Sequence, residues 1–262
     1  MKTFQNDTGV SLIEATVILS VMAVLTSVLA PSAMAYIDQA RQARARQDVQ
    51  SIGDAISSFV EDNGELQFLR TAHGATAQAP PTSRLDANRV NLLISDGDVP
   101  SLGTGVSGET YWTQLDSVAG VDTFSNHLIE NTPDDDSGLG ADTYRNPANI
   151  AVGGGANNID FARTESGGYN APYAWRGTYL RGPVSADPWG NRYAANVAWL
   201  DPSGTALPSG TITAGFVAAD IARLDVFVMS AGSDEEIDTR SAQDGAVPGD
   251  DDYIYIVASN AR

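Results

Sequence analysis

The chain offers few of the residue types on which enzymes depend. Cysteine is absent from its 262 residues, which excludes a thiolate nucleophile, a thiolate metal site and disulfide bonds. The two histidines, His73 and His127, have no neighbouring pattern of metal ligands, and the glycines at 153–155 lack the lysine and hydroxyl residue of a phosphate-binding loop. There is also no Ser-His-Asp spacing of a recognisable kind. We therefore expect that the protein is not an enzyme.

The acid in the most unusual surroundings is Glu14. It is the only charged residue between Val10 and Ala30, a stretch that would span about 30 Å as an α-helix, enough to cross the core of a bilayer. An ionisable group in hydrocarbon is costly and normally has a partner. The sequence therefore predicts a membrane-inserting helix in which Glu14 makes a functional contact.

The same helix is predicted to continue well beyond the apolar stretch. Apolar residues recur at three- and four-residue steps in its second half, at Val49, Ile52, Ile56 and Phe59. Asn63-Gly64 is typical of a helix end, and Pro31 is expected to kink or loosen the helix locally. We predict one helix from about Val10 to Asp62, apolar all round in its first half and with one apolar stripe in its second.

The remainder of the chain changes character near residue 179. Residues 65–178 are rich in Gly, Ala, Asn, Asp, Ser and Thr, and we expect a long, loop-rich insertion there. Strand patterns follow within Arg192–Leu200, Asp225–Met229 and Tyr253–Val257. A long helix packed on a small antiparallel sheet gives an α+β fold.

The chain is strongly acidic, with a formal net charge of −18. Such a charge argues against a nucleic-acid partner and favours solubility or cation binding. Because disulfides are excluded, calcium is a candidate for stabilising the globular part outside the cell.

The hexapeptide Gly9-Val10-Ser11-Leu12-Ile13-Glu14 resembles the processing site of type IV pilins and type II secretion pseudopilins. The resemblance implies that a prepilin peptidase cleaves after Gly9, that the new N-terminus at Val10 is methylated, and that Glu14 is the fifth residue of the mature chain. Pro31 stands where the family commonly has proline. In this family the acid neutralises the terminal ammonium of an adjacent subunit, which sets the register of a helical filament.

An ordinary secretory signal peptide is the alternative. Ala33-Met34-Ala35 follows the apolar run and has the form of a signal-peptidase site, so that the mature chain would begin at Tyr36 and would lack Glu14. Both interpretations export the protein.

A second passage resembles type II secretion major pseudopilins more narrowly. It is the run Asp187-Pro188-Trp189-Gly190-Asn191-Arg192-Tyr193. We expect Pro188 and Gly190-Asn191 to form a turn, Trp189 to bury a large area and Tyr193 to begin a strand. This motif indicates architecture and carries no chemistry of its own.

The same resemblance implies a calcium site near the C-terminus. Asp234, with Asp251 or Asp252, would supply carboxylates, and Ala231 and Ile237 would supply carbonyl oxygens. Glu235 stands where the family has glycine. A solvated acidic loop is the alternative.

These observations predict a leader at 1–9, a membrane or filament-core helix at 10–31, an amphipathic helix at 32–64, the insertion at 65–178 and a sheet region at 179–262. The function that the resemblance implies is a subunit of a type IV pilus-like homo-oligomeric filament, most like the pseudopilus that supports type II secretion. Its partners would be prepilin peptidase, other pilin-like subunits and the inner-membrane assembly machinery, with a single-pass precursor in the inner membrane and a periplasmic or extracellular filament. The alternative is a membrane-anchored adhesion or binding module that uses residues 65–178.

Overall fold

The structure is a computed structural model that describes residues 11–63, 90–106, 111–116, 121–132, 143–144, 158–159, 175–200, 224–243 and 245–258. The predicted leader, with Gly9 and Val10, and most of the predicted insertion lie outside these residues. The chain divides into two compact units, Met1–Ala43 and Arg44–Arg262.

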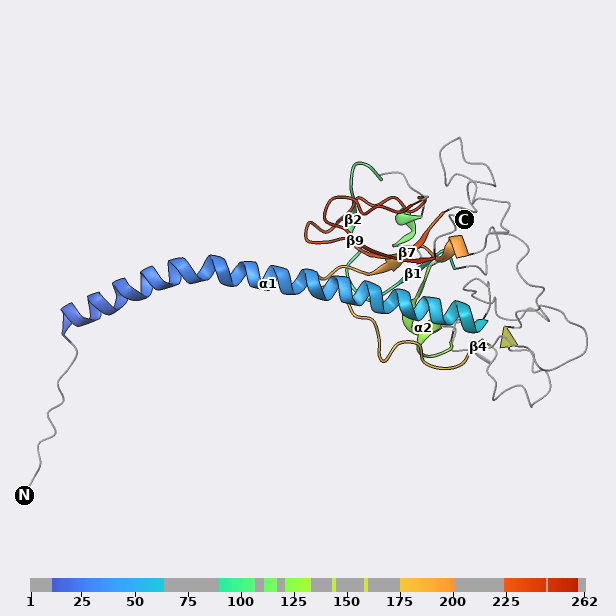
Figure 1. Cartoon of the computed structure of the whole chain (residues 1–262), viewed down its shortest axis with the longest axis horizontal. Coiled ribbons are helices and arrows are strands. Elements are labelled where there is room, and N and C mark those ends of the chain that lie inside the picture. Colours follow the sequence, from blue (N-terminus) through green and yellow to red (C-terminus); the bar gives the residue numbers. More distant parts are fainter. Residues whose placement is uncertain are drawn as a thin grey trace, which may run out of the picture. The chain divides into compact units, whose positions relative to one another are not determined.

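One helix, α1, runs from Leu12 to Asn63 (Figure 1). Its 52 residues include Pro31, and the helix continues through this proline without a break. The predicted helix from about Val10 to Asp62 is therefore confirmed. Its first half is long and apolar enough to cross a membrane, whereas its second half carries the predicted apolar stripe, with Val49, Ile52, Ile56 and Phe59 all buried.

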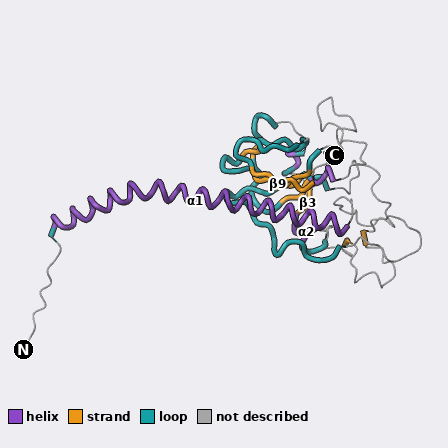
Figure 2. Tube along the Cα trace, in the orientation of Figure 1, coloured by secondary structure: helices purple, strands orange, loops and turns teal. Residues whose placement is uncertain are grey.

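The globular unit contains a five-stranded mixed sheet, drawn with the other strands in orange in Figure 2. The strands follow the order β3 (Val121–Thr123), β1 (Leu92–Ile94), β6 (Ala194–Ala195), β7 (Val226–Ser230) and β9 (Tyr253–Ala258). Neighbouring strands pair antiparallel except β1 and β3, which are parallel. The α+β class is thus correct, while the expectation of a purely antiparallel sheet is wrong.

Smaller elements complete the described fold. They are the helices η1 (Trp112–Gln114), α2 (Phe124–Leu128) and η3 (Val197–Leu200), the parallel pair β2 (Ser101–Leu102) and β8 (Glu236–Ile237), and the parallel pair β4 (Thr143–Tyr144) and β5 (Asn158–Ile159).

The strand predicted within Arg192–Leu200 is shorter than expected, and the cause is a buried asparagine. After Ala195, the Asn196 Oδ1 accepts the Phe227 N–H at 2.7 Å, so that a side chain takes a position beside β7 that the backbone would otherwise occupy. The chain then turns into η3, which buries Trp199 completely.

The two faces of the sheet contact different apolar clusters. Val226 and Val228 belong to the cluster that contains the second half of α1, while Phe227 and Met229 belong to a cluster with Trp112. This division follows from the alternation of side chains along a strand.

Three tyrosine hydroxyls attach the sheet unit to α1. Each donates to an aspartate of the helix: Tyr193 to Asp48 at 2.9 Å, Tyr255 to Asp54 at 2.8 Å and Tyr179 to Asp62 at 3.0 Å. The bonds occur at intervals along the helical segment within the globular unit and so help to fix its register on the sheet.

Candidate functional site

The first candidate site is the apolar half of α1. Every large apolar side chain between Leu12 and Ile37 is at least 51% exposed. No part of the most apolar stretch of the helix is buried by the other described residues. A helix that is apolar on every side needs lipid or other helices around it. This surface therefore requires an environment that the described residues do not supply.

Glu14 helps to cap the N-terminus of this helix. The Ser11 N–H donates to Glu14 Oε2 at 3.0 Å, and the Glu14 N–H donates to Ser11 Oγ at 3.2 Å. This reciprocal pair is a capping box, which satisfies two amides that have no partner inside the helix. The Ser-x-x-Glu spacing was visible in the sequence, and its capping role was missed there.

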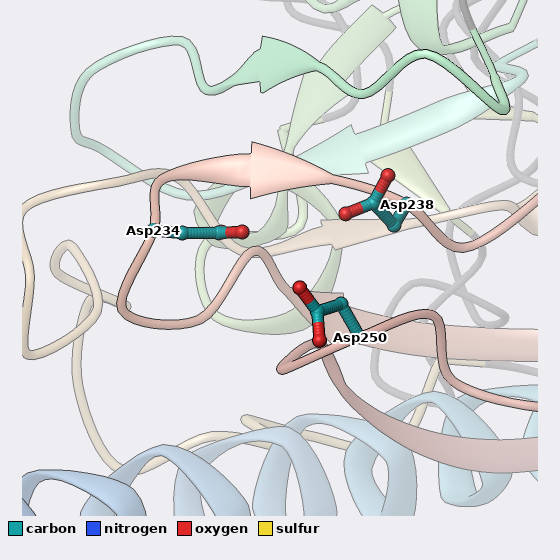
Figure 3. A group of neighbouring side chains, drawn as sticks. All are labelled: Asp234, Asp238 and Asp250. Atoms are coloured by element: carbon teal, nitrogen blue, oxygen red, sulfur yellow. The ribbon is translucent and has the colours of Figure 1, made fainter.

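The second candidate site is an acidic cluster in the globular unit. One carboxylate oxygen each from Asp234, Asp238 and Asp250 lies within 4.8 Å of the other two. Figure 3 shows Asp234 and Asp238 on either side of β8, with Asp250 facing them from the loop before β9. Of the predicted carboxylate ligands, Asp234 belongs to this group, whereas Asp251 and Asp252 do not. Asp238 and Asp250 belong to the group and were not predicted.

Asp251 and Asp252 hold the loops that carry the cluster. Asp251 Oδ2 accepts the Ser233 N–H at 2.6 Å, next to Asp234. Asp252 Oδ2 accepts the N–H groups of Asp238 and Thr239 at 2.9 and 2.7 Å. The other carboxylate oxygen of each residue is buried and has no hydrogen-bond partner among the described atoms.

The two predicted carbonyl ligands lie in the same loop. The Ile237 carbonyl accepts the Gly103 N–H at 2.9 Å, which leaves it one further lone pair, and Ala231 follows directly after β7. Between them, Glu235 has a φ of 64°, and Gly232 has a φ of 76°. A left-handed backbone at Glu235 explains why glycine is suited to that position.

Burial and neighbouring carboxylates raise the pKa of two acids in this region. Burial raises the pKa of Asp252 to about 6. Burial also raises the pKa of Asp234, to which the carboxylates of Asp251 and Asp238 add. Burial opposes ionisation of Asp251 too, but the Ser233 hydroxyl and amide hold the pKa of Asp251 below its ordinary value. The cluster is therefore a concentration of negative charge that a cation would relieve.

The Asp187–Tyr193 motif bonds to the end of β7, the strand that leads into this loop. Asp187 Oδ1 accepts the N–H groups of Trp189 and Asn191 at 3.0 and 2.9 Å, and Gly190 has the φ of 106° that the turn requires. Asp187 Oδ2 accepts the Ser230 hydroxyl at 2.7 Å, just before the acidic loop. The predicted turn is confirmed.

Trp189 differs from expectation. It is only partly buried, and its ring stacks on Tyr253 with a centroid distance of 5.8 Å. Among the described residues, Trp112 and Trp199 are the tryptophans that are fully buried.

His127 pairs with a buried acid in the globular unit. It is fully buried, and its Nε2 lies 3.0 Å from Asp122 Oδ2. Asp122 also accepts from the Thr123 N–H and the Asn126 amide, so that this pair fixes α2 to the end of β3.

Comparison of the chain with protein-family models, characterised proteins and solved structures finds no match.

Proposed function

We propose that this chain is a structural subunit of a type IV pilus-like helical filament, most like a type II secretion pseudopilus. The observation that carries the proposal is the division of α1 at the boundary of the two units. One half has apolar side chains exposed all round, and the other is built into an α+β globular unit. Such a subunit is stored in the membrane and assembles by packing its apolar half against those of its neighbours.

Prepilin peptidase would act after Gly9 and expose Val10 as the terminal ammonium. Glu14 is the acid available to that charge, and Pro31 lies farther along the same apolar segment. A charge left alone in an apolar bundle costs several kcal/mol, whereas a pair loses much of its attraction to desolvation. The contact is therefore more useful for fixing the spacing of subunits than for adding stability.

The test compares three variants in cells that contain the peptidase and the assembly machinery. Glu14→Ala and Glu14→Gln are expected to insert and to be processed but to leave filaments at background level. Ser11→Ala is the matched control, because it removes the capping hydroxyl at a cost of about 1 kcal/mol and keeps the charge. If Glu14→Gln assembled like the wild type, or if Ser11→Ala failed as completely as Glu14→Ala, the pairing role would be wrong.

We further propose that the acidic cluster binds calcium. The donors are hard oxygens from Asp234, Asp238 and Asp250, and carbonyl groups of Ala231 and Ile237 lie in the same loop, which suits the six to eight oxygen ligands that calcium takes. Asp251 and Asp252 then act on the site by holding Ser233 and Asp238. When bound, calcium would neutralise the cluster and join the loops on either side of β8.

Thermal melting of the full chain in detergent micelles tests this assignment. Calcium at about 100 times its Kd is expected to add about 2.7 kcal/mol to the free energy of unfolding, and chelator is expected to reverse the gain. Asp238→Asn should reduce the gain, whereas Asp96→Asn, an exposed acid outside the cluster, should keep it. Equal melting temperatures with calcium and with chelator would refute calcium binding.

A further inference from the structure

Asp238 is held more closely by its surroundings than the other two acids of the cluster. It is partly buried, whereas Asp234 and Asp250 are exposed. It follows directly after β8 (Figure 3), and its N–H donates to Asp252 Oδ2 at 2.9 Å. The groups that contact its side chain therefore decide whether its carboxylate can face the other two.

Gly103 forms the surface against which the Asp238 carboxyl group lies. This glycine is buried and follows β2, the strand that pairs with β8. A Cβ atom added at Gly103 would lie 2.7 Å from Asp238 Cγ and would overlap Asp238 Oδ1 as well. Carbon atoms that are not bonded to each other pack at about 3.5–4.0 Å. Any side chain at residue 103 would therefore displace the carboxyl group of Asp238.

The backbone at Gly103 does not itself require glycine. Gly103 is not one of the described glycines with a positive φ, so that alanine can adopt its conformation. Its N–H donates to the Ile237 carbonyl at 2.9 Å, a bond that every residue except proline can make. The space that the Asp238 carboxyl group occupies is therefore what excludes a side chain at this position.

A second glycine, Gly249, lies against the main chain of Asp238. A Cβ atom added at Gly249 would lie 2.5 Å from the Asp238 carbonyl carbon and 2.6 Å from Asp238 Cβ. Its N–H donates to Thr239 Oγ1 at 2.9 Å, and the next residue is Asp250 of the cluster. The loop before β9 can thus approach Asp238 closely enough to bring Asp250 beside it.

A buried oxygen of Asp252 is a separate indication of a cation in this place. Asp252 is only 5% exposed, and its Oδ2 accepts the Asp238 N–H. Its Oδ1 has no hydrogen-bond partner among the described atoms. Burying a charged oxygen without a partner is costly, and a cation at the adjoining cluster would offset part of that cost.

We infer, on the basis of the proposed calcium binding, that Gly103 is a positioning residue of the calcium site. Because it has no side chain, it leaves the Asp238 carboxyl group within reach of Asp234 and Asp250. A determinant of calcium affinity then lies after β2, in a segment far from the acidic loop in the sequence.

Calcium titration of the full chain in detergent micelles, followed by thermal melting, tests this role. Gly103→Ala is expected to raise the Kd for calcium about tenfold, at the low end of the 10–100-fold effect that residues orienting a metal ligand typically have. The melting temperature in chelator should change by less than about 3 °C, because the displaced group is the end of a side chain.

Gly105→Ala is the matched control. Gly105 lies two residues farther along, also without a positive φ, and a Cβ atom added there meets nothing within 4 Å. This variant should keep the Kd of the wild type.

Asp238→Ala shows whether Gly103 acts through the carboxyl group, since it removes the atoms that an alanine at residue 103 would overlap. Adding Gly103→Ala to Asp238→Ala should raise the Kd no further. An unchanged Kd in Gly103→Ala, a further loss in the double variant, or an equal fall of the melting temperature in chelator with and without the Asp238 carboxyl group would overturn the positioning role alone. If the wild type gained no stability with calcium, the proposed calcium site would be wrong, and this role with it.

Discussion

Individual acids in this chain have distinct tasks that depend on their surroundings. Glu14 closes a helix with Ser11, Asp187 organises a turn, and Asp122 holds a buried histidine. Asp252 receives two backbone amides and is nearly fully buried, with one oxygen unpartnered. Part of the large negative charge of the chain therefore consists of internal hydrogen-bond acceptors.

The buried Asp252 predicts a dependence of stability on pH when no divalent cation is present. Burial raises its pKa from the ordinary 3.8 to about 6, so that the folded state holds its proton more tightly than the unfolded state. The resulting stabilisation is complete below about pH 4 and is lost as the pH rises through 6, by up to about 3 kcal/mol. In chelator, the change in unfolding free energy between pH 4.5 and 7.5 should shrink in Asp252→Asn. An unchanged pH profile in that variant would contradict this account.

At the scale of elements, the contact between α1 and the sheet combines an apolar stripe with tyrosine–aspartate bonds. Tyr193 is buried and Asp48 partly so, whereas the bond of Tyr255 to Asp54 is exposed. Water can replace the second bond more readily than the first.

This difference predicts unequal costs for two matched substitutions. Tyr193→Phe is expected to lower the free energy of unfolding by about 1–2 kcal/mol, and Tyr255→Phe by less than about 0.5 kcal/mol. Burial and Asp48 also raise the pKa of Tyr193, so its contribution is complete below pH 10 and is lost as the pH rises through the raised pKa. Denaturant unfolding of the full chain in micelles gives both values. Equal losses would show that burial does not determine the strength of these bonds.

Gly53 allows β9 to approach the helix closely. A Cβ atom added at Gly53 would overlap the Tyr255 ring, because it would lie only 2.6 Å from Tyr255 Cε1. Gly53→Ala should therefore destabilise by about 1–2 kcal/mol, although alanine favours a helix by about 1 kcal/mol over glycine. Unfolding of this variant beside Ser58→Ala, an exposed control on the same helix, measures the effect. A gain in stability at residue 53 would mean that the ring moves aside without cost.

The sequence predicted α1 well because an apolar stretch long enough to cross a bilayer leads into a segment in which Val49, Ile52, Ile56 and Phe59 recur at helical spacing. It did not predict β1, since three consecutive buried residues show no alternation, nor the shortening of β6, which depends on Asn196 bonding to a strand thirty residues away. At the acidic loop, the composition indicated the correct segments. Which carboxylates converge depends on β8 pairing with β2 and on the bonds of Asp251 and Asp252, and these are three-dimensional features.

For the whole molecule, the proposed filament function accounts for a helix whose two halves have different surroundings. The apolar half of α1 has no covering partner among the described residues, whereas the apolar stripe of the second half is buried in the globular unit. In the proposed filament subunit, packing and the proposed calcium ion would supply the stability that disulfides give to many exported proteins.

The most direct test of the filament proposal is the intact mass of the protein in the high-speed pellet of sheared cells that contain prepilin peptidase. We predict a pelleted chain that begins at Val10, with or without one added methyl group, and that keeps Glu14. A chain beginning at Tyr36 and remaining in the supernatant would contradict the proposal, because it would lack both the apolar segment and the acid.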